Sequence, residues 1–253
     1  MSTGRNSRGD LREDIREAIE RVWPAGVVDG FSDSEESYFT DVYPKIAAAL
    51  GRLKGAQLVH EREPEGQPVW YERYHDEDDP PDDQENSRSY HLFFVCPEGG
   101  EFTYKTEMES LGDPGYEDDE EENEWPTGPV AGTGRTGWSV AVSLIAPLAA
   151  ITLGEMESFE DGTSLEPAIE PNAFSSTGER IDLEADFRKA KGEQAFAKLL
   201  KLRGRICGIL GKYGIGVLPE EEWRKPVPRL RADRDILLEE PLRVLDAFFF
   251  EWL

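Results

Sequence analysis

Apolar side chains in the first part of the chain recur at helical spacing. Within 11–22 they lie three or four positions apart, which places them on one face of a helix. Asp10, with Glu13 three residues later, forms a capping-box pattern, so we expect this helix to open at Asp10. A second helix is predicted over 35–53, with Pro44 either kinking it or starting its main part.

The hydrophobic period changes to two after these helices. Segments 57–63 and 69–75 flank a turn and predict a β-hairpin. Segment 89–96 is apolar on both faces, as expected of a central strand, and 101–108 alternates apolar and polar side chains. These four segments predict an antiparallel meander.

The second half of the chain returns to mixed patterns. We expect a helix over 137–146, a short buried strand over 149–153 and a further hairpin within 155–170. Segment 183–212 predicts a helix interrupted by a glycine. The final segment, 241–253, is amphipathic and is expected to dock through its aromatic side chains.

The predicted fold class is therefore α+β. An antiparallel meander sheet of about four to six strands is expected to pack against N-terminal and C-terminal helices, with long acidic loops. With 253 residues, 38% of them hydrophobic, the chain is long enough for a sizeable core. We expect a disordered tail over 1–9 and a single α+β domain over 10–253.

Acidic residues dominate the charge of the chain. There are 53 Asp and Glu against 28 Lys and Arg, which gives a formal net charge of −25. Such a field repels nucleic acid phosphates and anionic membranes and attracts cationic proteins. The carboxylates are densest in 75–88 and 111–126, two segments that are also rich in proline or glycine and are expected to be loops. The acidity could equally serve only to keep the protein in solution, or adapt it to high salt.

The two cysteines and the first residues of the chain indicate the cellular compartment. Cys96 and Cys207 lie in separate apolar stretches, so both are expected to be buried free thiols in a reducing compartment. The first residues show no signal peptide, and the apolar stretch 138–153 is shorter than the roughly 20 residues of a membrane helix. The expected location is cytoplasmic.

One glycine-rich motif could bind an anion. Gly132, Gly134 and Gly137 have the spacing GxGxxG and precede the predicted helix, so backbone N–H groups with Arg135 could hold a negative charge. A dinucleotide site, however, requires a buried strand directly before the glycines, and here the preceding sequence is acidic and contains proline. A flexible turn is the competing interpretation.

Other catalytic or metal-binding patterns do not emerge. The three histidines fall on separate predicted strands in registers that do not bring them together, so no metal site is predicted. Nucleophile motifs and calcium-loop spacing are also missing from the sequence, and neither a cofactor nor a catalytic residue is predicted.

The leading hypothesis is a non-enzymatic interaction protein that binds, and neutralises, a basic protein partner such as a toxin. Its two acidic loops would dock the partner by charge complementarity, with one tryptophan as an apolar anchor. The predicted partner-binding residues are Asp78, Asp79, Asp82, Asp83, Asp118, Asp119, Glu120, Glu121 and Trp125. The alternative is an enzyme or ligand-binding domain that uses Gly132–Gly137 and Arg135 for an anionic ligand.

Overall fold

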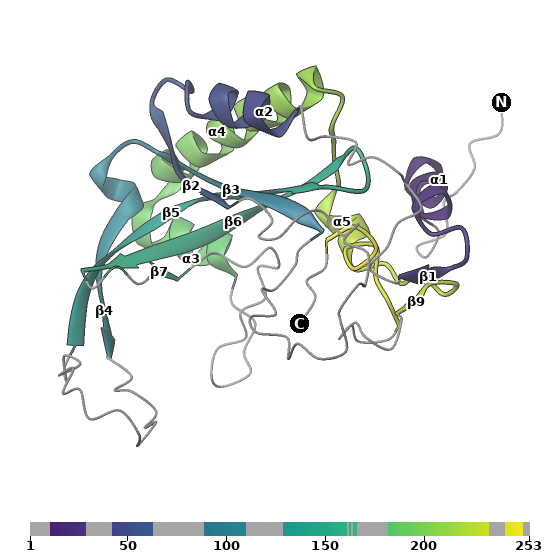
Figure 1. Ribbon diagram of the computed structural model, residues 1–253. Coiled ribbons are helices and arrows are strands. Elements are labelled where there is room, and N and C mark those ends of the chain that lie inside the picture. The colour runs from purple at the N-terminus through teal and green to yellow at the C-terminus, as the bar shows by residue number, and fades with distance from the viewer. Residues whose placement is uncertain are drawn as a thin grey trace, which may run out of the picture.

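The computed structural model describes residues 11–28, 42–62, 89–109, 129–160, 162, 164–165, 182–232 and 241–249. Within these ranges the chain forms an α+β fold in which helices flank a largely antiparallel sheet (Figure 1). The helices are α1 (Glu13–Val22), α2 (Tyr43–Leu50), α3 (Leu183–Lys191), α4 (Glu193–Lys212) and α5 (Glu220–Trp223), with a short 3-10 turn η1 (Gly100–Phe102). The predicted fold class is confirmed.

The main sheet has seven strands in the described part of the chain. They are β2 (Ala56–Arg62), β3 (Tyr90–Pro97), β4 (Thr103–Glu109), β5 (Pro129–Ser143), β6 (Leu148–Phe159), β7 (Ser164–Leu165) and β8 (Gly216–Val217). The order is β2-β3-β5-β6-β7, and neighbours in this order are antiparallel. β4 pairs with the first half of β5 and β3 with its second half, while β8 runs parallel to β6.

The predicted meander is therefore wrong in pairing 89–96 with 101–108, because both segments pair with β5 instead. The predicted strand 69–75 lies outside the described residues. The two-residue β7 confirms a hairpin after β6.

The helix predicted over 137–146 is wrong, because these residues belong to β5 and the turn after it. Trp138 and Val140 alternate with the small side chains of Ser139 and Ala141, and the strand pairs continuously with β6 from Gly132 onward. Alternation with period two favours a strand once neighbours supply the backbone partners. Ser139 is therefore fully buried instead of lying on an outer helix face.

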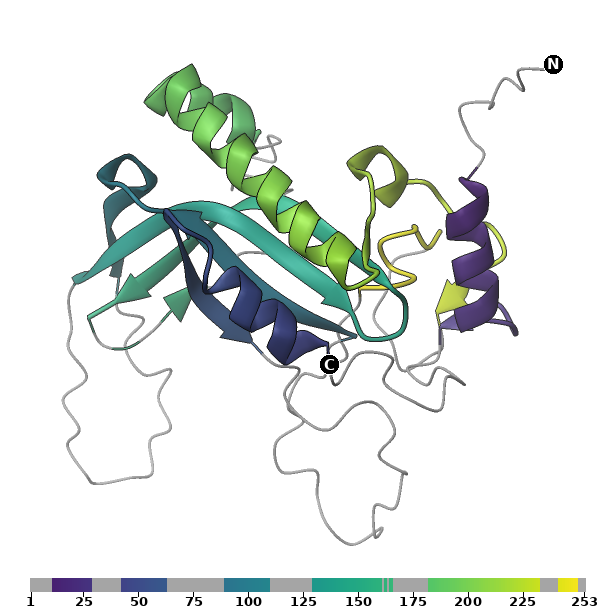
Figure 2. The ribbon, with the colours of Figure 1, turned by 90° about the horizontal axis from the view of Figure 1, so that it is seen from above.

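Three helices lie across one face of the sheet (Figure 2). α2 begins with Pro44 in its first turn, where a missing N–H leaves no bond unmade, so the proline starts the helix and does not kink it. α3 and α4 are separate helices because Gly192 between them has a φ of 83°. This confirms the predicted interruption of the segment.

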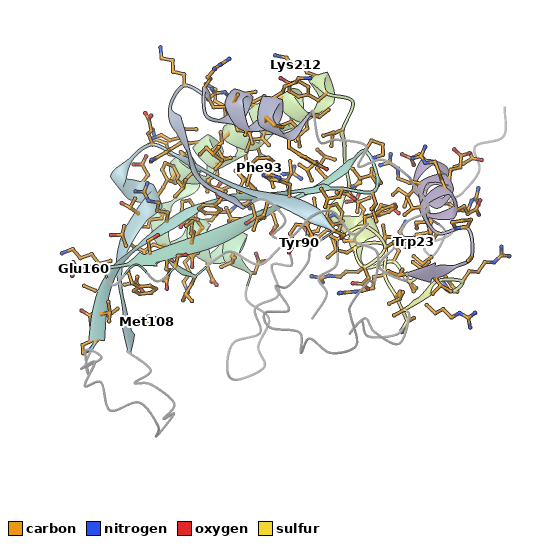
Figure 3. The ribbon with its side chains drawn as sticks, viewed as in Figure 1. Trp23, Tyr90, Phe93, Met108, Glu160 and Lys212 are labelled. Atoms are coloured by element: carbon orange, nitrogen blue, oxygen red, sulfur yellow. The ribbon has the colours of Figure 1, made fainter. Side chains whose placement is uncertain are left out.

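The centre of the core lies between α2, α4 and β3. All eight residues of β3 are buried, as expected of a strand with neighbours on both sides. The His91 ring stacks between Tyr43 of α2 and Phe93, with centroid distances of 5.1 and 4.4 Å (Figure 3 labels Phe93). Burial in this stack lowers the pKa of His91 to about 4.

The two ends of the described chain pack together beside the sheet. β1 (Val27–Val28) pairs in parallel with β9 (Arg231–Ala232), and the Trp23 indole N–H donates to the carbonyl of Ala247 at 2.8 Å. Segment 241–249 buries Phe248 and Phe249, which confirms the expected docking. α1 starts at Glu13 with Arg12 as its N-cap, so the predicted capping box does not form.

Both cysteines are free thiols, in different environments. Cys96 is buried on the sheet face opposite α4, where burial raises its pKa to about 11 against the opposing effect of Arg135. Cys207 is only half-buried, contrary to the expectation of full burial. Among the helices that the structure describes, none is both long and apolar enough to cross a membrane.

Candidate functional site

The predicted partner-binding residues lie outside the described residues. This applies to all nine of them, from Asp78 to Asp83 and from Asp118 to Trp125. Their role in binding a basic partner stays a prediction.

The glycine motif forms part of strand β5. A side chain at Gly132 would come within 2.6 Å of the Phe159 ring, and one at Gly134 would overlap the ring of Tyr104. At Gly137 a Cβ atom would lie 2.7 Å from the carbonyl oxygen of Val95. Close backbone packing therefore favours glycine at Gly137, whereas Gly132 and Gly134 leave room for the rings of Phe159 and Tyr104.

The anion-binding alternative assumed a glycine-rich loop, but Gly132–Gly137 lie within strand β5. These residues pair with β4 and β6, so no glycine turn at a helix N-terminus exists here. Arg135 instead donates from its guanidinium to Oε1 of Gln57 at 2.9 Å, a neutral partner on the neighbouring part of the sheet.

A cleft of about 640 Å³ opens on the helical side of the sheet. Strands β5 and β6 form its floor and α4 one wall, and the residues around the start of α3 and of α5 complete it. Its lining residues are Trp138, Ile151, Thr152, Leu153, Asp182, Leu183, Glu184, Leu200, Arg203, Cys207, Val217, Pro219, Glu220 and Glu221. The volume lies within the range of about 300–1,000 Å³ that is typical of ligand-binding sites.

The floor of the cleft is apolar and centred on Trp138. The indole N–H of Trp138 donates to the carbonyl of Leu199 at 2.8 Å, which fixes the ring under α4. The guanidinium of Arg203 lies over this ring, with its carbon 5.6 Å from the centroid. A guanidinium over an indole face is a favourable cation–π arrangement, so Arg203 covers this ring, and Trp138 is only 1% exposed.

The rim of the cleft is acidic. Asp182 caps α3, its carboxylate accepting from the N–H of Ala185 at 3.0 Å. Partial burial raises the pKa of Glu184, although Arg188, whose guanidinium lies 3.9 Å from the carboxylate, acts in the opposite direction. A carboxylate that has lost part of its hydration gains from an additional cation.

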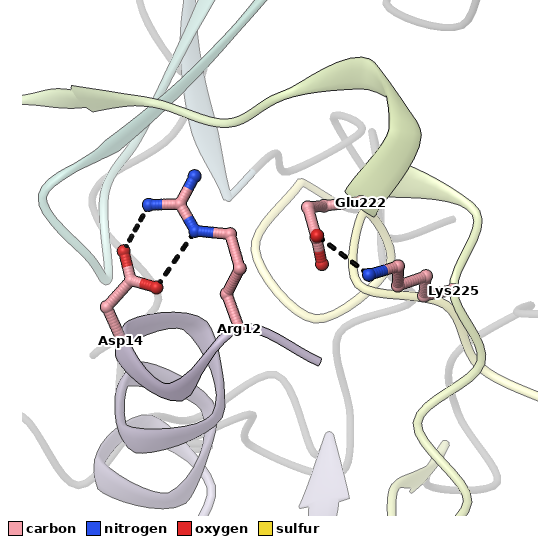
Figure 4. Close-up of polar contacts among 4 residues, drawn as sticks. All are labelled: Arg12, Asp14, Glu222 and Lys225. Carbon is pink, nitrogen blue, oxygen red and sulfur yellow. Dashed lines mark hydrogen bonds and ion pairs between the residues drawn. The ribbon is translucent and has the colours of Figure 1, made fainter. Parts of the chain in front are cut away.

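The remaining rim residues, Glu220 and Glu221, belong to α5, which is anchored by the two residues that follow them. Glu222 is buried and pairs with Lys225 at 2.7 Å, and the Trp223 indole donates to the Leu218 carbonyl at 2.9 Å. Figure 4 shows the Glu222–Lys225 pair together with the Arg12–Asp14 pair at the start of α1. Because Glu222 and Trp223 point inward, the two preceding glutamates of α5 are left exposed at the cleft.

The arrangement offers cation binding and apolar contact at one place. Arg203 is the one cation among the cleft residues, against four carboxylates, and Cys207 is the one thiol. Among the described residues, no group of three His, Cys, Asp or Glu side chains is placed to hold a metal ion. The cleft therefore combines four carboxylates at its rim with an apolar floor.

Sequence reasoning missed the cleft. Its residues come from five segments between positions 138 and 221, and only folding brings them together. The run Glu220–Glu221–Glu222–Trp223 was the one local signal of it, as an acidic stretch outside the predicted loops. Comparison with known proteins finds no family model, no curated protein and no solved structure that matches this chain.

Proposed function

We propose that this protein is a non-enzymatic interaction protein that binds a basic protein partner, and that the acid-rimmed cleft receives a cationic, partly apolar segment of it. The observation that carries the proposal is the combination of four carboxylates with a tryptophan floor in one cleft. Capping of a basic toxin, as an immunity or inhibitor protein does, is a function of this kind.

The cleft is suited to arginine side chains in particular. Arg203 already places its guanidinium over Trp138. A partner arginine at the cleft would meet the carboxylates of Glu184 and Glu220 at the rim, while Arg203 keeps the indole face. Apolar neighbours of that arginine would contact Ile151 and Leu153 on the floor. Anchors that combine a buried ring with charge complementarity dominate many protein interfaces.

The rest of the acidic charge would accelerate association. The described residues carry 22 Lys and Arg against 20 Asp and Glu, so 33 acidic and 6 basic residues lie in the other segments. A field of this sign steers a basic partner toward the protein and raises the association rate. We place the interaction in the cytoplasm, in keeping with the two free thiols.

Isothermal titration with a short peptide of alternating arginine and leucine tests the proposal. Replacing Glu184, Glu220 and Glu221 by glutamine should weaken binding by about tenfold or more, since ~1.4 kcal/mol corresponds to a factor of ten. The matched control replaces three exposed glutamates on the outer side of α1 and at the start of α4: Glu17, Glu20 and Glu193. Equal losses in the two variants would refute a specific role for the cleft.

A further inference from the structure

Two neighbouring segments of this acidic protein contain cations and no carboxylate. Residues 42–60 and 194–219 together include eight Lys and Arg side chains, but neither segment has an Asp or Glu. We call six of these cations the basic layer: Lys45, Arg52, Lys54, Lys201, Arg205 and Lys212. The layer belongs to α2, the turn after it and α4.

These elements lie side by side, so the charges gather on one surface. A guanidinium N–H of Arg205 donates to the carbonyl of Lys54 at 2.7 Å, and the Tyr213 hydroxyl to the carbonyl of Lys45 at 3.4 Å. Figure 2 shows α2 beside α4, and Figure 3 labels Lys212 on this outer side. On α4, Lys201 and Arg205 are four residues apart and therefore share one side of the helix.

The lysines of the basic layer have no acidic partner among the described residues, a property that they share with some other exposed cations such as Arg21. Other cations are neutralised by carboxylates, as in Arg12–Asp14, Arg188–Glu184, Lys198–Glu101 and Arg243–Asp246. Within the described ranges, no ion-pair partner is found for Lys45, Lys54, Lys201 or Lys212, and all four are exposed. An external anionic group can therefore bind them without breaking an existing pair.

A ridge of glycines follows the outer side of α4 next to these cations. Gly204, Gly208 and Gly211 are exposed, and a Cβ atom added at any of them would meet nothing within 4 Å. Each glycine costs a helix about 1 kcal/mol relative to alanine. Packing within the described chain does not explain them, whereas a second backbone approaching α4 closely would.

We propose that the basic layer is a docking surface for an acidic helix of a partner protein. Carboxylates spaced four residues apart on such a helix match Lys201 and Arg205 on α4, and the glycine ridge lets the two backbones approach. This surface is separate from the cleft, so the inference does not rest on the proposed function.

A protein helix fits this surface better than nucleic acid. A duplex carries one charge per about 1.7 Å along its whole length, so its ends would meet the net negative charge of the chain. A short acidic helix covers only the basic layer, and at 0.1 M salt charges beyond about 10 Å are screened. The glycine ridge has a use in helix packing but none in phosphate contact.

Fluorescence anisotropy tests this proposal with a labelled, acetylated 21-residue alanine-rich peptide that has glutamate at every fourth position. At 0.1 M salt and pH 7 we expect the full-length protein to bind it. The variant with Lys54, Lys201 and Lys212 changed to glutamine should bind at least tenfold more weakly. A control with the same charge change at Arg21, Lys105 and Arg229 should stay within twofold of the wild-type protein.

A second variant tests the ridge without weakening the fold. Gly204→Gln with Gly208→Gln should raise the melting temperature, since glutamine favours a helix more than glycine does, and should weaken peptide binding at least fivefold. No binding by the wild-type protein, or equal losses in the lysine variant and its control, would overturn the proposal. Tighter binding of a 21-base-pair duplex than of the peptide would show that the surface binds nucleic acid and not an acidic helix. Self-association that requires the same lysines would show that its partner is a second copy of this chain.

Discussion

Helix α4 separates two surfaces of opposite character. On one side, Leu200, Arg203 and Cys207 form the wall of a cleft that has four carboxylates at its rim. On the other side, Lys201, Arg205 and Lys212 belong to the basic layer, whose segments 42–60 and 194–219 contain no Asp or Glu. The carboxylates come from the residues around the starts of α3 and α5, so the packing of these segments against α4 gives the cleft its negative charge.

Net charge does not describe the surface of this protein, as the contrast between the two sides of α4 shows. The formal charge of −25 suggests uniform acidity, yet the described residues carry 22 basic against 20 acidic side chains. Because salt screens exposed charges over about 10 Å, a partner experiences the local patch more than the whole chain. The two proposals therefore assign partners of opposite charge to the two sides of α4.

The largest expected effect comes from breaking the sheet that carries both surfaces. A Cβ atom at Gly137 would lie 2.7 Å from the Val95 carbonyl oxygen and 3.0 Å from Cα of Cys96, and backbone atoms cannot move aside cheaply. Gly137→Val should therefore reduce the free energy of unfolding by about 3 kcal/mol, measured by urea denaturation. Ala131→Val, at an exposed position of the same strand, is the control and should change it by less than ~0.5 kcal/mol. A similar loss in both variants would contradict the role of close packing.

The second effect is a pH dependence of stability that has opposite signs at His91 and at the cleft. His91 lies under α2, and burial lowers its pKa to about 4, against about 6.5 in an unfolded chain. Between these values the unfolded chain binds a proton that the folded protein does not. The free energy of unfolding should therefore fall as pH drops from 6.5 to 4, by about 3 kcal/mol in full. On the cleft side the sign is opposite, because the raised pKa of Glu184 favours the folded, protonated form as pH falls.

The contribution of the histidine can be isolated with His91→Phe, which keeps a ring between Tyr43 and Phe93. Urea denaturation at pH 7, 5.5 and 4 should show the difference in stability between variant and wild type shifting in favour of the variant as pH falls. A difference that is constant across this range would show that His91 does not supply the pH dependence.

Local periodicity predicted much of the fold, and pairing explains what it missed. β2, β3 and β4, and the interruption at Gly192, follow from residues close together in sequence. The strand character of 137–143 depends on partners in β3 and β6, so glycines and small side chains misled the sequence reasoning there. The fold class was still predicted correctly, because taking part of β5 for a helix did not change the packing of helices against one sheet.

The candidate site was less accessible to sequence reasoning than the fold. Trp138, Glu184 and Glu220 are far apart along the chain and meet only after folding. The basic layer was visible as two carboxylate-free segments, but the total charge of −25 directed attention to the acidic loops. Counting charges by segment would have found it, because the absence of Asp and Glu over 194–219 is a local property.

The smallest and most discriminating effect comes from replacing each of two arginines of α4 by glutamine in separate variants. Arg203 is the one cation lining the cleft and lies over Trp138, whereas Arg205 belongs to the basic layer. Arg203→Gln frees the indole face and removes a positive charge, so the arginine–leucine peptide should bind about two- to fivefold more tightly, in keeping with a cation–π contact of ~0.5–1 kcal/mol. Binding of the glutamate peptide should not change.

Arg205→Gln should have the reverse pattern, weakening the glutamate peptide about twofold while leaving the arginine–leucine peptide unaffected. Both changes remove one charge from the same helix two residues apart, so each variant serves as the control for the other. Measured at equal salt, a crossed pattern of affinities requires two surfaces that act independently. If both variants changed both affinities in the same direction, the protein would respond to its total charge, and the division of α4 into two sides would have no role in binding.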